Sequence, residues 1–432
     1  MSNGLVSPSS KWSKVMRDAF QGRQRPVVGT VEVDKLEQAA REKLQDRRDA
    51  FYYVFGSAGT CSTNAANRRQ FEKWGIIPRM LRDVTDRSIE TTIFGVKYAS
   101  PVLLAPIGVQ GIVHGDAELA SAAAAAKLGV PFIMSTASTR SIEAVGKASG
   151  SGPRWYQLYW PRTPEVTLSI LSRAKASGFS TLVITLDTMS LGWRPHDIDT
   201  AYLPFFHGVG AQIGFTDPVF MGLHNLAPLA HDDVPEFPYD PEKIDRLITA
   251  GDKTAKLRSQ LGEQWIGQVT SGTFRTWEDL KFIQDNWDGE IVLKGIQNVQ
   301  DAELAVDYGI NGIVVSNHGG RQVDGAIASL YALEQICKSP KVREAQASGQ
   351  LTVLFDSGIR TGSDIFKALA LGAQAVLYAR PYMYGLAVAG QAGVENVVQS
   401  LLADFEITLG LSGYRSVSEI QGKGQEVLAR ME

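Results

Sequence analysis

Eight short apolar segments, separated by helix-like stretches, constrain the fold of this 432-residue chain more than any other feature. Each segment is apolar at consecutive rather than alternate positions, which is typical of parallel strands buried on both faces. Strands that alternate with helical patterns indicate βαβ units, and eight such strands close a (β/α)8 barrel. A doubly wound open sheet is the alternative, but no G-x-G-x-x-G follows the first segment. The segments span residues 101–108, 131–136, 154–160, 181–188, 291–296, 312–317, 351–358 and 373–380.

The stretches between these segments include clear helical patterns, and two regions lie outside the repeating unit. We predict helices over residues 117–128, 164–177, 299–308 and 363–371. Residues 1–100 contain a helical stretch, 33–55, and we interpret them as a cap and lead-in that belong to the same domain as the barrel of residues 101–432.

The second region is an insertion of roughly ninety residues, 187–276, where a βα loop usually has about 2–6. It follows the fourth strand, so in a barrel it leaves the face on which active sites lie. We expect an active-site lid, and the alternative is an oligomer contact or a disordered insertion.

Composition excludes several classes of partner. A net charge of −3 gives no reason to expect nucleic acid or an anionic membrane as a partner.

Two cysteines, Cys61 and Cys337, form no disulfide framework and favour a reducing compartment. The chain shows neither an apolar secretory segment at its start nor a run of 18 apolar residues. We therefore expect a cytoplasmic protein, and no pattern in the chain indicates a bound metal.

Polar side chains stand at the ends of six of the eight segments, where a barrel would direct them into one mouth. Strand ends are often polar, and a histidine taken alone is more often structural than catalytic. So many polar ends, with Arg321 three residues after His318, instead favour a catalytic site. The residues are Gln157, Tyr159, Thr185, Asp187, Lys294, Ser316, His318, Asp356 and Arg380.

The last two segments add a second signal. The sequence FDSGIRTGSD places Gly358 and Arg360 just before a predicted helix, and Arg380 ends the eighth segment. Barrels often bind phosphate with the loops after strands seven and eight, at a helix N-terminus. These residues predict a phosphorylated ligand beside the histidine, and the alternative is that both arginines form surface ion pairs.

The chain also resembles a known protein family over most of its length. SNHGGRQVDG, residues 316–325, resembles the active-site signature of the FMN-dependent L-2-hydroxy acid oxidases and dehydrogenases, which include glycolate oxidase. The resemblance covers about residues 35 to 425, and within the family the chain is most similar to lactate 2-monooxygenase. Further matching segments, in order, are LAPIGVQG, WYQLYWP, ITLDT, LGWRP, VLKGI, LFDSGIRTG and FKALALGA.

The resemblance implies roles for individual residues. His318 would be the base, Arg321 and Arg194 would hold the substrate carboxylate, and Tyr159 would bond the substrate. A cap tyrosine would also contribute, either Tyr53 or, with a one-residue gap in the match, Tyr52. The cofactor would be FMN, with Pro106, Ile107 and Gly108 beside flavin N5, with Ser135, Gln157, Thr185, Lys294 and Ser316 on the ring, and with Asp356, Ser357, Gly358, Arg360, Ala379 and Arg380 around the ribityl chain and phosphate.

The activity that the resemblance implies is oxidation of a small L-2-hydroxy acid, in particular L-lactate, by O2. The lactate 2-monooxygenase reading adds decarboxylation to acetate, CO2 and water. The alternatives are an oxidase that releases keto acid and H2O2, or a dehydrogenase with another acceptor. An FMN isomerase or a phosphate-binding barrel without redox chemistry is disfavoured by His318 with Arg321. The resemblance also implies a homotetramer or larger assembly.

Four positions depart from what is usual in the family. Gly108 stands where many oxidases carry alanine, and we expect it to leave space beside flavin N5. Ala137 replaces a large side chain over the substrate, which predicts a roomier pocket. Thr60 replaces an acidic cap residue, and Ala379 replaces a glycine at the phosphate. We also expect the arginines near His318 to lower its pKa, because a positive neighbour disfavours a second positive charge.

Overall fold

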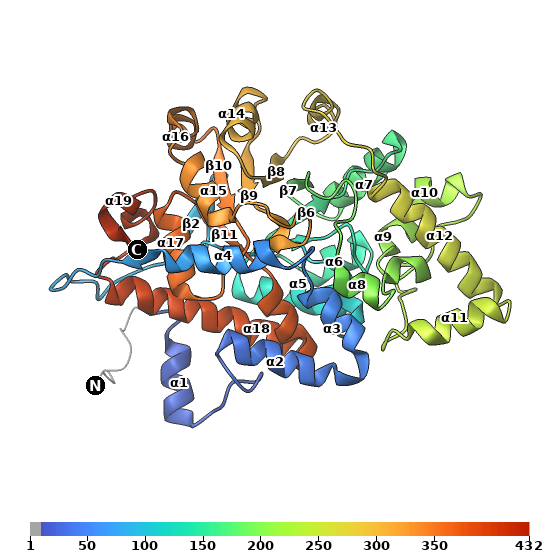
Figure 1. Ribbon diagram of the computed structural model, residues 1–432, viewed down its shortest axis with the longest axis horizontal. Helices are drawn as coiled ribbons and strands as arrows, with labels where there is room; N and C mark the ends of the chain where they lie inside the picture. Colours follow the sequence, from blue (N-terminus) through green and yellow to red (C-terminus); the bar gives the residue numbers. More distant parts are fainter. Residues whose placement is uncertain (1–9, 432) are drawn as a thin grey trace.

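The computed structural model describes residues 10–431 and contains a closed barrel of eight parallel strands (Figure 1). Strands that follow one another in the chain are neighbours in the barrel, and pairing of the last strand with the first closes it. Each predicted segment contains one strand, so the predicted (β/α)8 barrel is confirmed. The strands are β4 Val102–Leu104, β5 Phe132–Met134, β6 Arg154–Leu158, β7 Thr181–Thr185, β8 Glu290–Ile296, β9 Gly312–Val315, β10 Thr352–Phe355 and β11 Ala375–Tyr378.

Helices surround this barrel, and those predicted from the sequence agree with the structure to within one residue at either end. Helix α18, which is kinked at Ala389 and Gly390, packs against both α5 and α17 and so joins the last part of the chain to the first strands. The surrounding helices are α5 Ala117–Leu128, α6 Ile142–Ala148, α7 Pro164–Ala176, α13 Leu280–Gln284, α14 Val299–Asp307, α15 Ser329–Ile336, α16 Pro340–Ala347, α17 Gly362–Ala370 and α18 Arg380–Leu411.

Apolar side chains fill the barrel interior, and a hairpin closes its amino-terminal end. The hairpin consists of β2 Thr91–Ile93 and β3 Val96–Tyr98. Its Phe94 ring lies 5.7 Å from that of Trp155, near the start of β6. Because this end is plugged, a ligand can reach the barrel only from the carboxyl ends of the strands.

The amino-terminal region packs alongside the barrel as several short helices, which are drawn in shades of blue above and below α18 in Figure 1. Residues 33–55 are helical, as expected from the sequence, except for a break at the buried Leu44. The stretch is therefore two helices joined through a short 3-10 helix, and not one continuous helix. The elements are α1 Lys14–Gly22, α2 Val33–Lys43, η1 Gln45–Arg47, α3 Arg48–Phe55, α4 Ser62–Glu72 and β1 Trp74–Ile76, which pairs with β12 Leu428–Arg430.

The insertion after β7 is folded into short helices that gather on one side of the barrel, on the right in Figure 1. It is anchored by Asp217, whose buried carboxylate lies 3.0 Å from Arg173 of α7. Its elements are α8 Pro195–Asp199, η3 Pro204–His207, α9 Gln212–Phe215, α10 Pro218–Leu223, α11 Pro241–Thr249 and α12 Lys253–Val269. The remaining short elements of the chain are η2 Gln110–Ile112, η4 His318–Gly320, η5 Val417–Glu419 and α19 Gly424–Val427.

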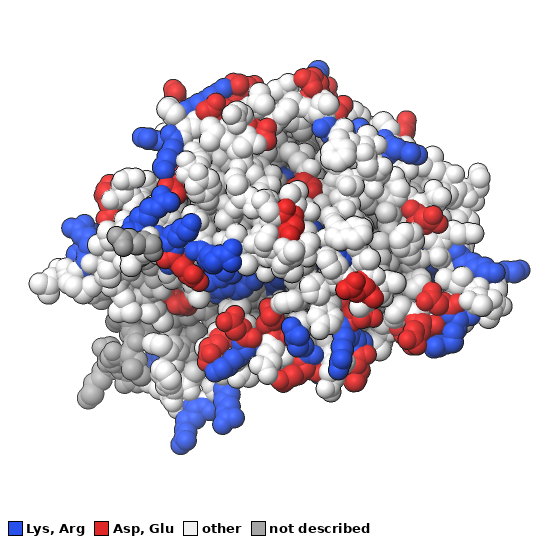
Figure 2. Space-filling model, in the orientation of Figure 1, with Lys and Arg blue, Asp and Glu red and all other residues white. Residues whose placement is uncertain are grey.

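Charged side chains of both signs are interspersed over the face drawn in Figure 2. This distribution agrees with the small net charge. Among residues 10–431, no helix combines the length and the apolar character that crossing a membrane requires.

Candidate active site

A pocket opens at the carboxyl ends of the barrel strands and contains most of the residues singled out from the sequence. The empty space in this pocket, including the part that is open to solvent, is about 1260 Å³. The predicted residues that line it are Tyr53, Pro106, Ile107, Gly108, Tyr159, Arg194, Lys294, His318, Arg321, Asp356, Ser357, Gly358, Arg360, Ala379 and Arg380.

Four predicted residues, Ser135, Gln157, Thr185 and Ser316, lie behind this lining and are buried. Gln157 joins two neighbouring strand ends, because its Oε1 accepts from Ser135 Oγ at 3.2 Å and its Nε2 donates to Thr185 Oγ1 at 3.0 Å. Lys294 Nζ donates to Ser316 Oγ at 3.1 Å and lies 3.5 Å from Asp356. The side chains at these strand ends thus form a wall of two bonded groups, one from β5 to β7 and one from β8 to β10.

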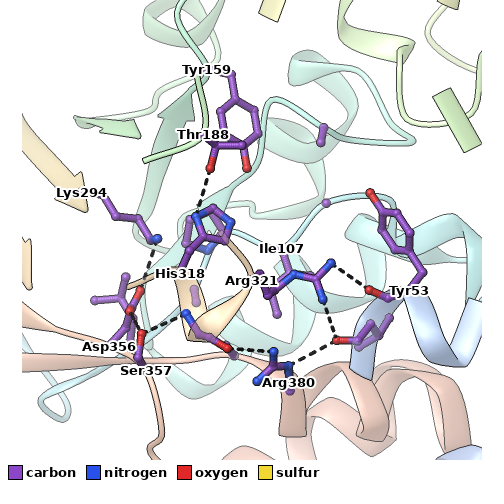
Figure 3. A pocket seen from close by; sticks show the side chains of 18 of the residues that line it. Tyr53, Ile107, Tyr159, Thr188, Lys294, His318, Arg321, Asp356, Ser357 and Arg380 are labelled. Atoms are coloured by element: carbon purple, nitrogen blue, oxygen red, sulfur yellow. Dashed lines mark hydrogen bonds and ion pairs between the residues drawn. The ribbon is translucent and has the colours of Figure 1, made fainter. Parts of the chain in front are cut away.

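His318 lies at the centre of the pocket, between Lys294 on one side and Arg321 on the other (Figure 3). Its Nδ1 is 2.8 Å from Asp187 Oδ1 and 3.2 Å from Thr188 Oγ1. Burial alone would raise the pKa of Asp187, but attraction to His318 and Lys294 brings it down to about 2. An ionised carboxylate only accepts hydrogen bonds, so the neutral ring donates from Nδ1 and keeps Nε2 as its proton acceptor.

The pKa of His318 lies below its usual value, mainly because of burial. Lys294 lowers it further, Arg194 contributes less, and Asp187 opposes both. The direction expected from the sequence was correct, and the expected cause was correct in part: Arg194 lowers the pKa, but burial and Lys294 contribute more. The ring is therefore neutral at pH 7 and can act as a base.

Two arginines predicted to bind a carboxylate stand at one side of His318. Arg321 Nη2 donates to the carbonyl of Tyr53 at 2.9 Å, and its Nη1 to that of Gly56. Arg194 Nε donates to the Arg321 carbonyl at 3.0 Å. Burial, together with Arg194 and Arg380, lowers the pKa of Arg321 to about 9. An anion would relieve this concentration of positive charge, which suits the site to a carboxylate.

The structure distinguishes the two candidate cap tyrosines. Tyr53 lines the pocket with its ring 5.8 Å from the Arg321 guanidinium, whereas Tyr52 stacks on His196 at 5.4 Å outside the lining. Burial raises the pKa of Tyr53 to about 12, and burial also raises that of Tyr159. Both hydroxyls are therefore protonated at neutral pH and can donate hydrogen bonds to a substrate.

The two arginines expected at the phosphate are placed differently. Within residues 10–431, the hydrogen bonds of the Arg360 guanidinium are limited to one, from Nη1 to the Ile359 carbonyl at 2.9 Å. The Arg380 guanidinium instead contacts the cap and the β9 loop. Its hydrogen bonds go to the carbonyls of Val54, Gly56 and Gly319, to Ser57 Oγ and to Asn64 Oδ1. Arg360 thus keeps donors for a phosphate, and Arg380 uses its donors on the protein.

Gly108 and Ala137 both line the pocket, but they touch each other. A Cβ built on Gly108 would lie 2.5 Å from Ala137 Cβ and 2.8 Å from the Ala137 carbonyl oxygen. Val109 N also donates to that oxygen at 2.7 Å. The expectation that Gly108 leaves open space was therefore wrong; glycine is needed there because two loops approach closely.

The side chains present fit FMN. Lys294 is buried beside Ser316 and Asp356, and its positive charge would offset the negative charge of a reduced flavin. Arg360 offers free donors at the end expected for phosphate, and Ser357 and Gly358 beside it have positive φ values of 81° and 111°. Such backbone conformations are frequent where main-chain N–H groups bind anions. FMN requires one cationic side chain for the flavin ring and another for the phosphate. Lys294 and Arg360 are suited to these two roles.

Sequence reasoning missed two groups of residues in this site. Asp187 was noted only as a polar strand end, although a carboxylate in reach of a histidine signals an orienting partner. The second group consists of residues from the insertion, whose apolar character carries no signal of function in the sequence. The apolar ones that line the pocket are Leu191, Phe205, Ile266 and Val269, and Thr188 and Thr270 line it as well.

Comparison with known proteins agrees with this geometry. The family model described as FMN-dependent dehydrogenase matches residues 40–427. An FMN-dependent alpha-hydroxy acid dehydrogenase of Schizosaccharomyces pombe is 47% identical over 398 residues, 91% of this chain and 90% of that protein. An L-lactate oxidase of Lysinibacillus sphaericus is 36% identical over 401 residues, 91% of this chain and 93% of that protein.

A crystal structure of mandelate oxidase superposes with a TM-score of 0.72, at 34% identity over 90% of this chain and 97% of that one. With a buried histidine, paired arginines and a matching family model over most of its length, the chain belongs to the family of FMN-dependent dehydrogenases that oxidise α-hydroxy acids, and its cofactor is FMN.

Proposed function

We propose that the protein oxidises a small L-2-hydroxy acid, with L-lactate as substrate and O2 as acceptor, and that the keto acid is decarboxylated before release. The products are then acetate, CO2 and water, which balance one L-lactate and one O2. The observation that carries the proposal is that residues of the insertion line the pocket. Leu191, Phe205 and Val269 stand over the same cavity as His318.

The residues act on the substrate as follows. Arg321 and Arg194 hold the carboxylate, and the hydroxyls of Tyr53 and Tyr159 donate to the substrate oxygens. His318 accepts a proton from the substrate at Nε2, and Asp187 stabilises the imidazolium that forms. The chemistry that bound FMN supplies is acceptance of the two electrons that the substrate loses. Lys294 offsets the negative charge that accumulates beside it.

Decarboxylation requires that the keto acid remain bound until the peroxide has reacted with it. A lid slows release and excludes water from the site. The insertion contributes apolar side chains and is anchored through Asp217, which supports a lid that keeps its position over the pocket. We therefore assign retention of the keto acid to residues 187–276.

Product analysis tests the proposal. After complete turnover of L-lactate in air, NMR should show acetate, and a parallel assay should detect little peroxide. Phe205→Leu shortens a side chain that lines the pocket, and it should raise pyruvate and peroxide at the expense of acetate. Phe206→Leu is the matched control, because Phe206 is the next residue and its side chain is 45% exposed. Stoichiometric pyruvate and peroxide from the unmodified protein would exclude decarboxylation.

A second candidate is an oxidase or dehydrogenase that releases the keto acid of a larger 2-hydroxy acid. The observation that favours it is Ala137, a small residue in a pocket with Phe205, Ile266 and Val269 on its walls. A series of L-2-hydroxy acids with longer apolar side chains separates the two candidates. If kcat/KM rises steadily from lactate to mandelate, the second candidate is correct. Ala137→Leu should then shift the preference back toward lactate.

A further inference from the structure

Asp324 is the next-to-last residue of the SNHGGRQVDG segment and does not line the pocket. Its carboxylate nevertheless accepts four hydrogen bonds from two residues of the cap. Oδ2 accepts from Thr60 N at 2.8 Å and from Thr60 Oγ1 at 2.7 Å. Oδ1 accepts from Ser62 N at 2.9 Å and from Ser62 Oγ at 2.6 Å. These hydrogen bonds, from the Ser62 hydroxyl first, hold the pKa of Asp324 well below its usual range.

The carboxylate meets a helix start that lacks a cap of its own. Ser62 begins α4, and Cys61 before it has a positive φ of 63° and makes no side-chain capping bond. A carboxylate at a helix N-terminus satisfies N–H groups that have no partner within the helix and interacts favourably with the helix dipole. Asp324 thus caps α4 from a loop more than 260 residues away in the sequence.

The hydrogen bonds of Asp324 with Thr60 and Ser62 are the outermost of a series of contacts that leads along the two segments into the pocket. Ala58 N donates to the Gly320 carbonyl at 2.9 Å. Next, the Arg321 guanidinium donates to the carbonyls of Gly56 and Tyr53. Residues 53–62 and 320–324 therefore lie side by side, with Asp324 at one end and the pocket at the other. We call this contact the cap clasp.

We propose that Asp324 is a positioning residue for the oxidation of 2-hydroxy acids: by holding the cap clasp closed, it keeps Arg321 and Tyr53 directed at the substrate carboxylate. The proposal rests on the proposed function for the roles of Arg321 and Tyr53. Asp324, Thr60 and Ser62 do not line the pocket, so their effect is on the binding of the carboxylate, through Arg321 and Tyr53, more than on FMN.

Thr60 stands where the resemblance to the family leads us to expect an acidic residue. Its Oγ1 donates to Asp324, whereas the acidic residue expected there would place a second carboxylate against the first. Like charges in direct contact repel. Thr60 and Asp324 therefore act as a pair, and changes at either position should be coupled.

The test measures the Kd of oxalate, a substrate-like dicarboxylate, by flavin absorbance on the FMN-loaded protein. Asp324→Asn should raise this Kd roughly tenfold, because two hydrogen bonds from each of two cap residues lose their charged acceptor. FMN content should stay at the wild-type level, and the flavin reduction rate at saturating L-lactate should change less than KM does. Thr60→Val, which removes one donor, should give a smaller rise in Kd.

Thr60→Asp should weaken oxalate binding as Asp324→Asn does, and the double variant Thr60→Asp with Asp324→Asn should restore it, because one carboxylate then faces one amide. Asp279→Asn is the matched control, since Asp279 also accepts from a threonine, Thr276 N at 2.8 Å, but lies outside the clasp.

The possible outcomes separate this inference from the proposed function. If Asp324→Asn lowers the melting temperature and leaves the oxalate Kd unchanged, the residue is structural only and the inference is overturned. If the wild-type protein does not bind oxalate at all, the carboxylate site itself is wrong, and the proposed function fails together with the inference.

Discussion

The flavin-ring side of the pocket and its substrate side are built in different ways. On the ring side, Ser135, Gln157 and Thr185 end neighbouring strands and hydrogen-bond to one another through buried side chains. On the substrate side, Tyr53 comes from the cap, Arg194 from the insertion, and Arg321 from the β9 loop. These residues are held mainly by backbone carbonyls of other segments.

This difference teaches how each side can be altered. The register of the barrel holds the ring side in place, so a single substitution there perturbs a wall that neighbouring strands keep rigid. The substrate side depends on loops that meet only in the folded molecule. We therefore expect substitutions on the substrate side to affect binding and chemistry while FMN stays bound.

The largest effect is expected from His318→Ala. Loss of the general base should slow flavin reduction by roughly 10²–10⁴, and FMN should remain bound because the ring-side wall is untouched. Anaerobic stopped-flow absorbance at the flavin band measures the rate. Reduction at nearly the wild-type rate would show that His318 is not the base.

The second largest effect is expected from Arg321→Lys, which should weaken substrate binding. A lysine cannot make a two-pronged contact with a carboxylate, and each hydrogen bond to a charged group is worth about 1.5–3 kcal/mol, or roughly 10- to 150-fold in Kd. Arg321 also bonds the Tyr53 carbonyl, so the cap should loosen as well. Titration with oxalate checks the prediction, and an unchanged Kd with normal FMN content would contradict it.

Substitution of Arg360 and Arg380, the two arginines expected at the phosphate, tests the comparison further. Comparing the Kd of FMN with that of riboflavin, which lacks the phosphate, isolates contacts to that group. Arg360→Ala should reduce the preference for FMN about tenfold or more, since a charge-assisted bond is lost. Arg380→Ala should change this ratio little, because the Arg380 guanidinium contacts the cap and the β9 loop. A large fall in the ratio for Arg380→Ala would assign that side chain to the phosphate.

The smallest effect is expected in the pH dependence. Neutral His318 is the active form, so the reduction rate should fall as pH drops through its pKa, which lies below the usual histidine value. Asp187 raises that pKa through its negative charge. In Asp187→Asn, the pKa should fall, and the acidic limb of kcat/KM should move to lower pH. A shift of the acidic limb to higher pH would contradict the assignment of Asp187 as the partner of His318.

Local patterns in the sequence determined the barrel and its ring side. Continuous apolar runs mark buried parallel strands because both faces of such a strand exclude water, and the polar residue that ends each run must point into the mouth. Gln157, Thr185, Lys294 and His318 could therefore be located from their positions at strand ends alone. The resemblance to a known family added their roles.

Only the tertiary structure decided how distant segments meet. The contact of Gly108 with Ala137, the cap contacts of Arg380 and the pairing of Asp187 with His318 depend on where loops pack, and loop packing leaves no period in the sequence. The same reason explains why Phe205 and Val269 escaped prediction. Apolar residues in an insertion look alike whether they face a core, a partner or a substrate, because burial of apolar surface is non-directional.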